Sequence, residues 1–302
     1  MFVVTGASGF IGSNMISYLN RLGIKDIIAL DDFEVDQRLG YATRANYTNL
    51  QDCRFSKVHP ISTDEREILP AGDIGGVFHF GAISNTLEKN QQKIDYYNTR
   101  YTEVLGKVCR ERGIPLVFAS TAAVYGNGNG PLNLYAESKL KGEESIKNSA
   151  VCMRLFNVYG KKEAHKGRMA SVVYKWFNEL SSEGRIRIFE NSHLYKRDFV
   201  YVGDVCAAAW SAVENYKPGV YDFGSGTSLS FEEVADLVIE AFGAGEREYI
   251  PLPYDLAPQY QTNTVADLSP MRELGFGVDP LHPREGISLY MKHLMKMEKA
   301  YG

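Results

Sequence analysis

The 302-residue sequence lacks the features that mark membrane-bound, secreted and nucleic-acid-binding proteins. It has no apolar run near the roughly 20 residues of a membrane-spanning helix, so we expect no membrane association. A net charge of −4 offers no basic surface, and we expect no nucleic-acid partner. The four cysteines are far apart and form no C-x-x-C pair, which indicates reduced thiols, no metal site and a cytoplasmic protein.

Short apolar runs alternate with longer amphipathic segments through the first half of the chain. Runs of β-branched and aromatic residues predict buried parallel strands at residues 2–5, 27–30, 77–80 and 116–119, and further strands are predicted at 151–156 and 198–202. Helical periodicity occupies residues 11–22, 91–112, 136–147 and 205–214, with Asp204 as the expected N-cap of the last of these helices. Such alternation predicts an α/β fold, a Rossmann-type doubly wound parallel sheet.

The second half of the chain is less regular. Helices are predicted at residues 231–242 and from about 284 to 297, with prolines between them. We therefore predict a smaller, discontinuous C-terminal substrate lobe beside the sheet. The predicted division assigns residues 1–160 and 199–224 to the dinucleotide-binding domain, and residues 161–198 and 225–302 to the lobe.

A glycine pattern, T-G-A-S-G-F-I-G at residues 5–12, follows the first predicted strand and opens the first predicted helix. Its spacing lets the backbone turn tightly and approach a pyrophosphate at the helix N-terminus, where free N–H groups favour anions. We expect Gly6, Gly9, Phe10, Ile11 and Gly12 to bind a dinucleotide.

An acidic residue, Asp31, ends the second predicted strand nineteen positions after Gly12 and is expected to bind the adenosine ribose. That residue, with Asp32 beside it, favours NAD, whereas Arg38 offers a partner for the 2′-phosphate of NADP, so the residues leave both open. The rest of the cofactor groove is assigned to Phe80, Gly81, Ala82, Asn98 and Val158.

Tyr135 and Lys139 are four residues apart and therefore lie on one face of a predicted helix. A nearby ammonium, with a cationic nicotinamide ring, lowers the cost of a phenolate and lets tyrosine act as a base nearer neutral pH. Thr121, at the end of the preceding strand, can hydrogen-bond the reacting oxygen. These three residues predict hydride transfer at an alcohol carbon.

Together these residues resemble the extended short-chain dehydrogenase/reductase superfamily, whose members include sugar-nucleotide epimerases, dehydratases and reductases. Ala122 and Ala123 stand where the dehydratases carry an acidic pair, which disfavours elimination. The segments F-N-V-Y-G (156–160), H-K-G-R-M-A-S (165–171), Y-K-R-D-F-V-Y-V-G-D-V (195–205) and Y-Q (260–261) resemble the ADP-L-glycero-D-manno-heptose 6-epimerase family.

The resemblance implies a second acid/base group at Lys166, which also lies against the cofactor. It implies bound NADP rather than NAD, an ADP-heptose substrate, a place in lipopolysaccharide-precursor synthesis and a homo-oligomer, a pentamer by resemblance. The residues assigned to the nucleotide-sugar are Asn157, Arg168, Lys175, Phe189, Glu190, Asn191, Ser192, Arg197 and Tyr260. The structural alternatives are a loop lysine at 166 and an ion pair between Arg197 and Asp198.

Departures from this family fall on the substrate side. Arg168 stands where a small hydroxyl residue is usual, Lys175 stands where histidine is common, and the loop after Gly126 is short. These departures do not alter the predicted redox residues, but they leave the identity of the sugar undecided. The alternatives are a 4-epimerase acting on a UDP- or GDP-sugar and, from another class, a non-catalytic dinucleotide-binding sensor.

Overall fold

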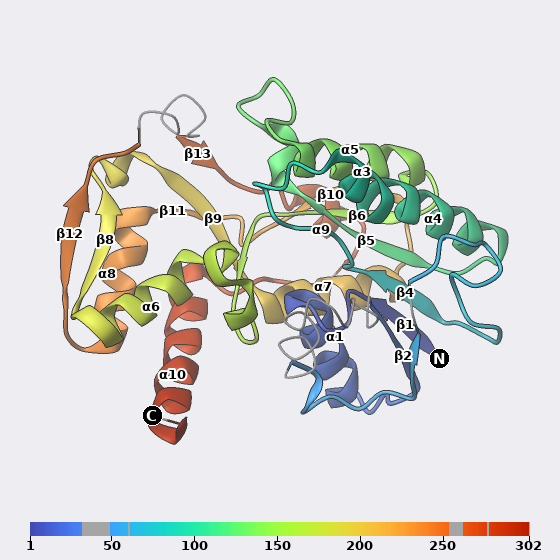
Figure 1. Cartoon of the computed structure of the whole chain (residues 1–302), viewed down its shortest axis with the longest axis horizontal. Helices are drawn as coiled ribbons and strands as arrows, with labels where there is room; N and C mark the ends of the chain where they lie inside the picture. Colours follow the sequence, from blue (N-terminus) through green and yellow to red (C-terminus); the bar gives the residue numbers. More distant parts are fainter. Residues whose placement is uncertain (32–48, 60, 254–261, 277, 302) are drawn as a thin grey trace.

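The computed structural model describes residues 1–31, 49–59, 61–253, 262–276 and 278–301. Its centre is a seven-stranded, wholly parallel sheet in the order β10-β6-β5-β4-β1-β2-β3 (Figure 1). The strands are β1 (Phe2–Thr5), β2 (Ile27–Leu30), β3 (Lys57–His59), β4 (Gly76–His79), β5 (Leu116–Thr121), β6 (Val151–Leu155) and β10 (Gly219–Phe223). The predicted doubly wound sheet is therefore confirmed.

Helices cover both faces of this sheet (Figure 1). On one face α1 (Phe10–Arg21) packs against α7 (Val202–Glu214), and on the other α4 (Tyr101–Glu111) packs against α5 (Leu134–Ile146). Alternate residues of the strands enter the two cores, so Val4 lies in the core beneath α1 and Val3 in the core beneath α4. Because both faces of the sheet are buried, successive side chains of each strand are apolar, which explains the continuous apolar runs in the sequence.

The second half of the chain forms two small sheets beside the large one. One contains β9 (Lys196–Tyr201), paired with β7 (Asn157–Tyr159), β11 (Ser228–Ser230) and β13 (Asn263–Thr264). The other pairs β8 (Arg185–Phe189) with β12 (Glu246–Ile250). A third apolar core joins β8 to the helices α6 (Val172–Glu183), α8 (Phe231–Phe242) and α10 (Pro283–Tyr301), and the short α9 (Ser269–Glu273) follows β13.

The strands of the large sheet all fall within residues 1–160 and 199–224, although the domain bounds themselves stay a prediction. Two local predictions are wrong. Asp204 is not an N-cap, because α7 begins two residues earlier with Tyr201 as its cap, and the Asp204 carboxylate accepts the Leu281 N–H instead. The predicted helix 91–112 is interrupted: α3 (Gln91–Ile94) leads into a π-helical turn (Asp95–Arg100) before α4.

Candidate active site

The glycine turn after β1 is built so tightly that only glycine fits at two of its positions. Gly6 has φ +62°, and a Cβ there would lie 2.7 Å from the Gly81 Cα at the end of β4. A Cβ on Gly12 would lie 2.1 Å from the Gly6 carbonyl oxygen. The turn brings the backbone against the start of α1, whose free N–H groups and dipole attract an anion.

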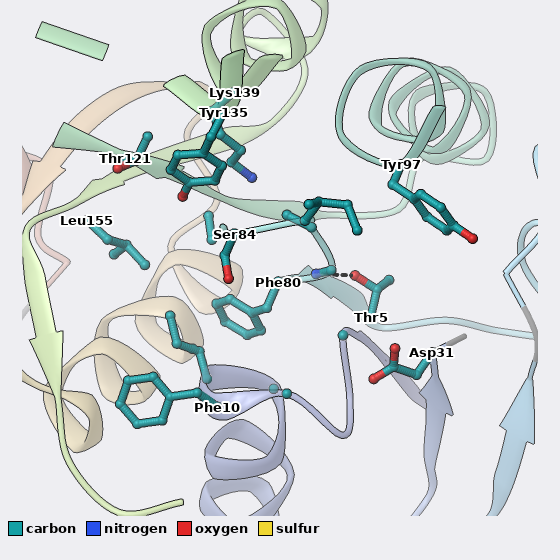
Figure 2. A pocket seen from close by; sticks show the side chains of 18 of the residues that line it. Thr5, Phe10, Asp31, Phe80, Ser84, Tyr97, Thr121, Tyr135, Lys139 and Leu155 are labelled. Carbon is teal, nitrogen blue, oxygen red and sulfur yellow. Dashed lines mark hydrogen bonds between the residues drawn. The ribbon is translucent and has the colours of Figure 1, made fainter. Parts of the chain in front are cut away.

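Asp31 follows β2 and faces this turn from the neighbouring strand. Its Oδ2 accepts hydrogen bonds from the Ser8 N–H at 2.8 Å and from the Ser8 hydroxyl at 2.5 Å. Thr5 Oγ1 accepts the Gly81 N–H at 3.0 Å and ties β1 to the loop after β4 (Figure 2). Ser8 was not predicted as a site residue, although its place within the glycine pattern was a usable signal.

A cavity of about 920 Å³ opens where β1 and β4 meet, which is the point where the strand order of the sheet reverses. Ligands of doubly wound folds bind at this point, outside the carboxyl ends of the strands. The cavity is lined by most of the predicted cofactor and catalytic residues: Gly6, Gly9, Phe10, Ile11, Gly12, Asp31, Phe80, Gly81, Ala82, Thr121, Tyr135, Lys139, Val158 and Lys166 (Figure 2). Its size, glycine cradle and carboxylate fit a dinucleotide.

Asn98 does not line the cavity, contrary to the expectation. It is fully buried in the π-helical turn, where its side chain accepts the Ile83 N–H at 2.7 Å and donates to the Ile83 carbonyl oxygen at 3.0 Å. The same amide donates to the Ser138 hydroxyl at 2.9 Å. Asn98 thus holds the loop after β4 against α5, the helix that carries the predicted catalytic pair.

Tyr135 lies in the first turn of α5, which begins after Asn133, and its phenol points into the cavity beside Thr121 (Figure 2). Burial raises the pKa of the Tyr135 phenol, and a hydrogen bond with Thr121 partly opposes that rise. Because Thr121 Oγ1 already accepts the Ala123 N–H, its own hydroxyl hydrogen is available to the phenol oxygen. The expected lowering of the tyrosine pKa is therefore not produced by the protein's own groups.

Lys139 is buried one turn further along α5, with its ammonium 3.9 Å from the centroid of the Phe118 ring. Burial lowers the pKa of Lys139 from 10.5 to about 7, and the neighbouring Cys152 and Glu143 oppose this shift. The amine therefore titrates near neutral pH, so its charge is sensitive to every nearby ionised group.

Lys166 enters the same cavity from a different part of the chain, a 3₁₀ turn at Ala164–Met169. Its Nζ lies 5.1 Å from the centroid of the Phe10 ring. Burial lowers the Lys166 pKa, Glu163 opposes this and the Lys175 ammonium adds to it. The cavity therefore holds two candidate proton-transfer groups, Tyr135 and Lys166, on separate elements.

Those predicted nucleotide-sugar residues that the structure describes do not line this cavity. Asn157 is exposed and donates to the Asp198 carbonyl oxygen, and Lys175 donates to the Arg168 carbonyl oxygen at 3.5 Å. The rest of the described set lies on β8, the turn after it, and β9: Phe189, Glu190, Asn191, Ser192 and Arg197. Tyr260, Asp32 and Arg38 fall outside the described residues.

Arg197 lies on β9 over the Phe231 ring, with 5.6 Å between the guanidinium carbon and the ring centroid. The neighbouring Asp198 points away into the protein, where it accepts hydrogen bonds from the N–H groups of Gly226 and Ala266 and from both donors of Ser225. Neighbouring strand residues face opposite sides. The Asp198 carboxylate is thus held by backbone and serine donors, rather than by the ion pair with Arg197 that was the alternative to a substrate contact.

A second cavity of about 670 Å³ adjoins the first and shares Phe156 with it. Its other walls include Tyr125, the Asn127 loop, Asp222 and Thr264. The Tyr125 hydroxyl donates to Asp222 at 2.6 Å across this space. Sequence reasoning missed this cavity, since its walls come from four separated segments without a shared motif.

Among the described residues, no helix is both long and apolar enough to cross a membrane, and no group of three or more metal-binding side chains occurs.

The comparisons agree with this geometry. A family described as the NAD dependent epimerase/dehydratase family matches residues 2–224. Among solved structures, the ADP-L-glycero-D-manno-heptose-6-epimerase of Helicobacter pylori is 27% identical with a TM-score of 0.81, covering 97% of this chain and 96% of that chain. The UDP-glucose 4-epimerase of Thermotoga maritima is 23% identical with a TM-score of 0.82, covering 98% and 99%. A Bacillus cereus UDP-glucuronic acid 4-epimerase, solved with UDP-glucuronic acid and NAD, is 22% identical with a TM-score of 0.79, covering 98% and 99%.

Proposed function

Because this chain belongs to the NAD dependent epimerase/dehydratase family, we propose that it is a sugar-nucleotide epimerase that acts on ADP-glycero-manno-heptose at C6. The observation that carries the choice is the presence of Lys166 in the cavity that also holds Tyr135. A single-tyrosine epimerase has no use for a second buried amine there. Similarity to the Helicobacter enzyme supports the substrate.

The bound nicotinamide dinucleotide supplies the acceptor, and later the donor, of one hydride. Its pyrophosphate would lie on the Gly6–Gly12 turn, with its adenosine ribose at Asp31. Thr121 would orient the substrate oxygen and Tyr135 would remove its proton, and the family resemblance assigns Lys139 to stabilise the phenolate charge once the cationic nicotinamide is also in place.

Reversal of configuration requires hydride return to the opposite face of the ketone. If the bound nicotinamide kept its position, the carbonyl group would have to turn, and its oxygen would then point away from Tyr135. Lys166 approaches from the 3₁₀ turn and can give that oxygen its proton. Tyr135 would then serve one epimer and Lys166 the other.

The choice of NADP over NAD stays a proposal from the family resemblance. Asp31 lines the cavity and suits a ribose hydroxyl, whereas the 2′-phosphate partner Arg38 lies outside the described residues. Denaturing the purified protein and identifying the released dinucleotide decides between them. Retention of NAD alone would remove the role given to Arg38.

The function is tested by incubating the protein with ADP-heptose, UDP-glucose, UDP-glucuronic acid and GDP-mannose, without added cofactor. We expect NMR to show inversion at C6 of ADP-heptose and no change in the others, with Tyr135→Phe as the inactive control. Inversion at C4 of a UDP- or GDP-sugar would make the protein a 4-epimerase instead. Binding of cofactor without turnover of any sugar would favour a sensor. Sedimentation of the same sample tests the proposed homo-oligomer.

A further inference from the structure

A buried carboxylate lies directly behind the predicted catalytic pair. Glu143 follows Lys139 by four residues on α5, as Lys139 follows Tyr135, so all three share one helix face. Its side chain is 0% exposed. A charged side chain is almost never fully buried unless it is paired.

Both oxygens of this carboxylate are engaged. Oε2 accepts the Ser120 hydroxyl at 2.7 Å and the Arg154 Nε–H at 3.0 Å, while Oε1 accepts from Arg154 Nη2 at 2.5 Å. Ser120 immediately precedes Thr121 on β5, and Arg154 lies on the next strand, β6. Glu143 therefore fastens the Tyr135 helix to the strand that carries Thr121.

Arg154 also contacts Tyr125, on the segment that follows β5. Its guanidinium carbon lies 4.8 Å from the centroid of the Tyr125 ring, and the Tyr125 hydroxyl donates to Asp222 on β10. The contacts of Glu143 and Arg154 thus join α5 to three adjacent strands at the carboxyl edge of the sheet. The cluster is largely shielded from water, since the Arg154 side chain is only 20% exposed and the Glu143 side chain is 0% exposed.

The charge on Lys139 depends on the few groups that surround it. Those groups are Tyr135 and Glu143 on α5, His79 on β4, Phe118 on β5, and Cys152 and Arg154 on β6. Burial keeps two of them neutral, because it lowers the His79 pKa well below its usual value and raises the Cys152 pKa. Cys152 and Glu143 are the two neighbours that oppose the effect of burial on the Lys139 pKa, and Glu143 is the carboxylate of the two, one helical turn away on the same face of α5.

We propose that Glu143 is a positioning residue that keeps Lys139 charged and holds Tyr135 in register with Thr121. This inference rests on the proposed function for its catalytic consequence, but the charge on Lys139 can be measured without any turnover. The carboxylate acts through Lys139 and does not line the cavity itself.

The experiment titrates the Lys139 amine by NMR in protein carrying ¹⁵N-labelled lysine, with Lys139→Met identifying the signal. In Glu143→Gln we expect the titration midpoint to fall by about one pH unit, as loss of a neighbouring opposite charge does. Glu144 on the same helix is exposed and pairs with Lys147, so Glu144→Gln is the matched control and should leave the midpoint unchanged.

The second readout is the rate of hydride transfer against pH. In Glu143→Gln the pH at which the rate falls on the alkaline side should also decrease by about one unit. The rate at pH 8 should therefore be about tenfold lower than that of the wild type. Glu143→Asp should restore part of it. If Glu143→Gln lowers the melting temperature but moves neither the NMR midpoint nor the pH limb, the residue is only structural and the inference fails.

Removing Glu143 alone leaves the Arg154 charge without its partner and can prevent folding. The double variant Glu143→Gln/Arg154→Gln removes both charges and should fold, with the Lys139 midpoint still lowered. An unchanged midpoint in the double variant would overturn the inference. If wild-type protein epimerises no sugar but the midpoint shifts as expected, the proposed function fails and the role of Glu143 stands.

Discussion

The large sheet and the two small sheets place polar side chains by different means. On the large sheet, residues that end β1, β2, β4 and β5 meet at one edge, and the predicted cofactor residues gather there around one cavity. In the region of the small sheets, the predicted substrate residues are spread over the strand β7, a 3₁₀ turn, the helix α6 and the β8–β9 segment. In a parallel sheet, the strand order alone brings the residues that end the strands to one edge. Residues on connecting segments come together only when the complete tertiary structure forms.

The largest expected effect concerns the two proton-transfer groups, Tyr135 on α5 beside the large sheet and Lys166 on the 3₁₀ turn. Unequal contributions of these two residues to the rate would contradict the comparison most clearly. Positioned acid/base groups contribute on the order of 10²–10⁴-fold. We expect Tyr135→Phe and Lys166→Met each to lower epimerisation by that factor. Given an analogue with an aldehyde at the reacting carbon, each variant should still dismutate it, oxidising one molecule to the carboxylate and reducing another to the alcohol with its remaining acid.

The exposed Lys161 lies in the same segment as Lys166, and Lys161→Met is the control, expected to epimerise normally. If Lys166→Met turns over at the wild-type rate, the two-group mechanism is lost and a one-tyrosine mechanism replaces it.

A smaller effect is expected at the glycine turn. An added Cβ at Gly12 would overlap the Gly6 carbonyl oxygen at 2.1 Å, whereas one at Gly9 would lie 3.1 Å from it. Overpacking costs about 1–3 kcal/mol, so Gly12→Ala should weaken dinucleotide binding about 10- to 100-fold and Gly9→Ala much less. Titration calorimetry measures both, with circular dichroism as the check on folding. Equal affinities would show that the turn does not hold the pyrophosphate.

A still smaller effect is expected for Arg168 on the substrate side. Its side chain is exposed, so losing one solvated contact to a diphosphate should raise the Michaelis constant only about threefold to tenfold. Arg168→Ser should leave dinucleotide affinity and the rate of hydride transfer unchanged. An unaltered Michaelis constant for every sugar tested would place Arg168 outside the substrate site.

The last prediction concerns stability rather than catalysis. The Lys139 pKa is lowered to about 7 in the folded protein from 10.5, so between these pH values the unfolded chain binds a proton that the folded chain lacks. The free energy of unfolding should therefore rise with pH across this window, and below it the burial cost is constant. Lys139→Met should remove that part of the rise, whereas Lys141→Met at an exposed neighbour should keep it. Urea unfolding at pH 6.5, 8 and 9.5 measures the difference.

Local pattern was sufficient for most strands of the large sheet and the residues that end them. The strands β3 and β10 were not predicted, and the strand predicted at 198–202 lies in a small sheet. The turn from β1 into α1 was predictable because glycine spacing is a backbone requirement, and the four-residue step from Tyr135 to Lys139 is a property of any helix. Continuing that step to Glu143 would have found the buried carboxylate. By contrast, periodicity did not reveal that the helix expected at 91–112 contains a π-helical turn, in which the Asn98 side chain binds the backbone of Ile83.

The sequence alone therefore determined the fold class and the positions of strands β1, β2, β4, β5 and β6, but not those of β3 and β10. Tertiary structure alone decided that Lys166 reaches the same cavity as Tyr135, and that Asn98 lies behind its wall. It also decided that Lys139 is buried deeply enough for its amine to titrate near neutrality. Periodicity is a local property of the chain, whereas burial and the meeting of distant segments depend on how all the elements pack together.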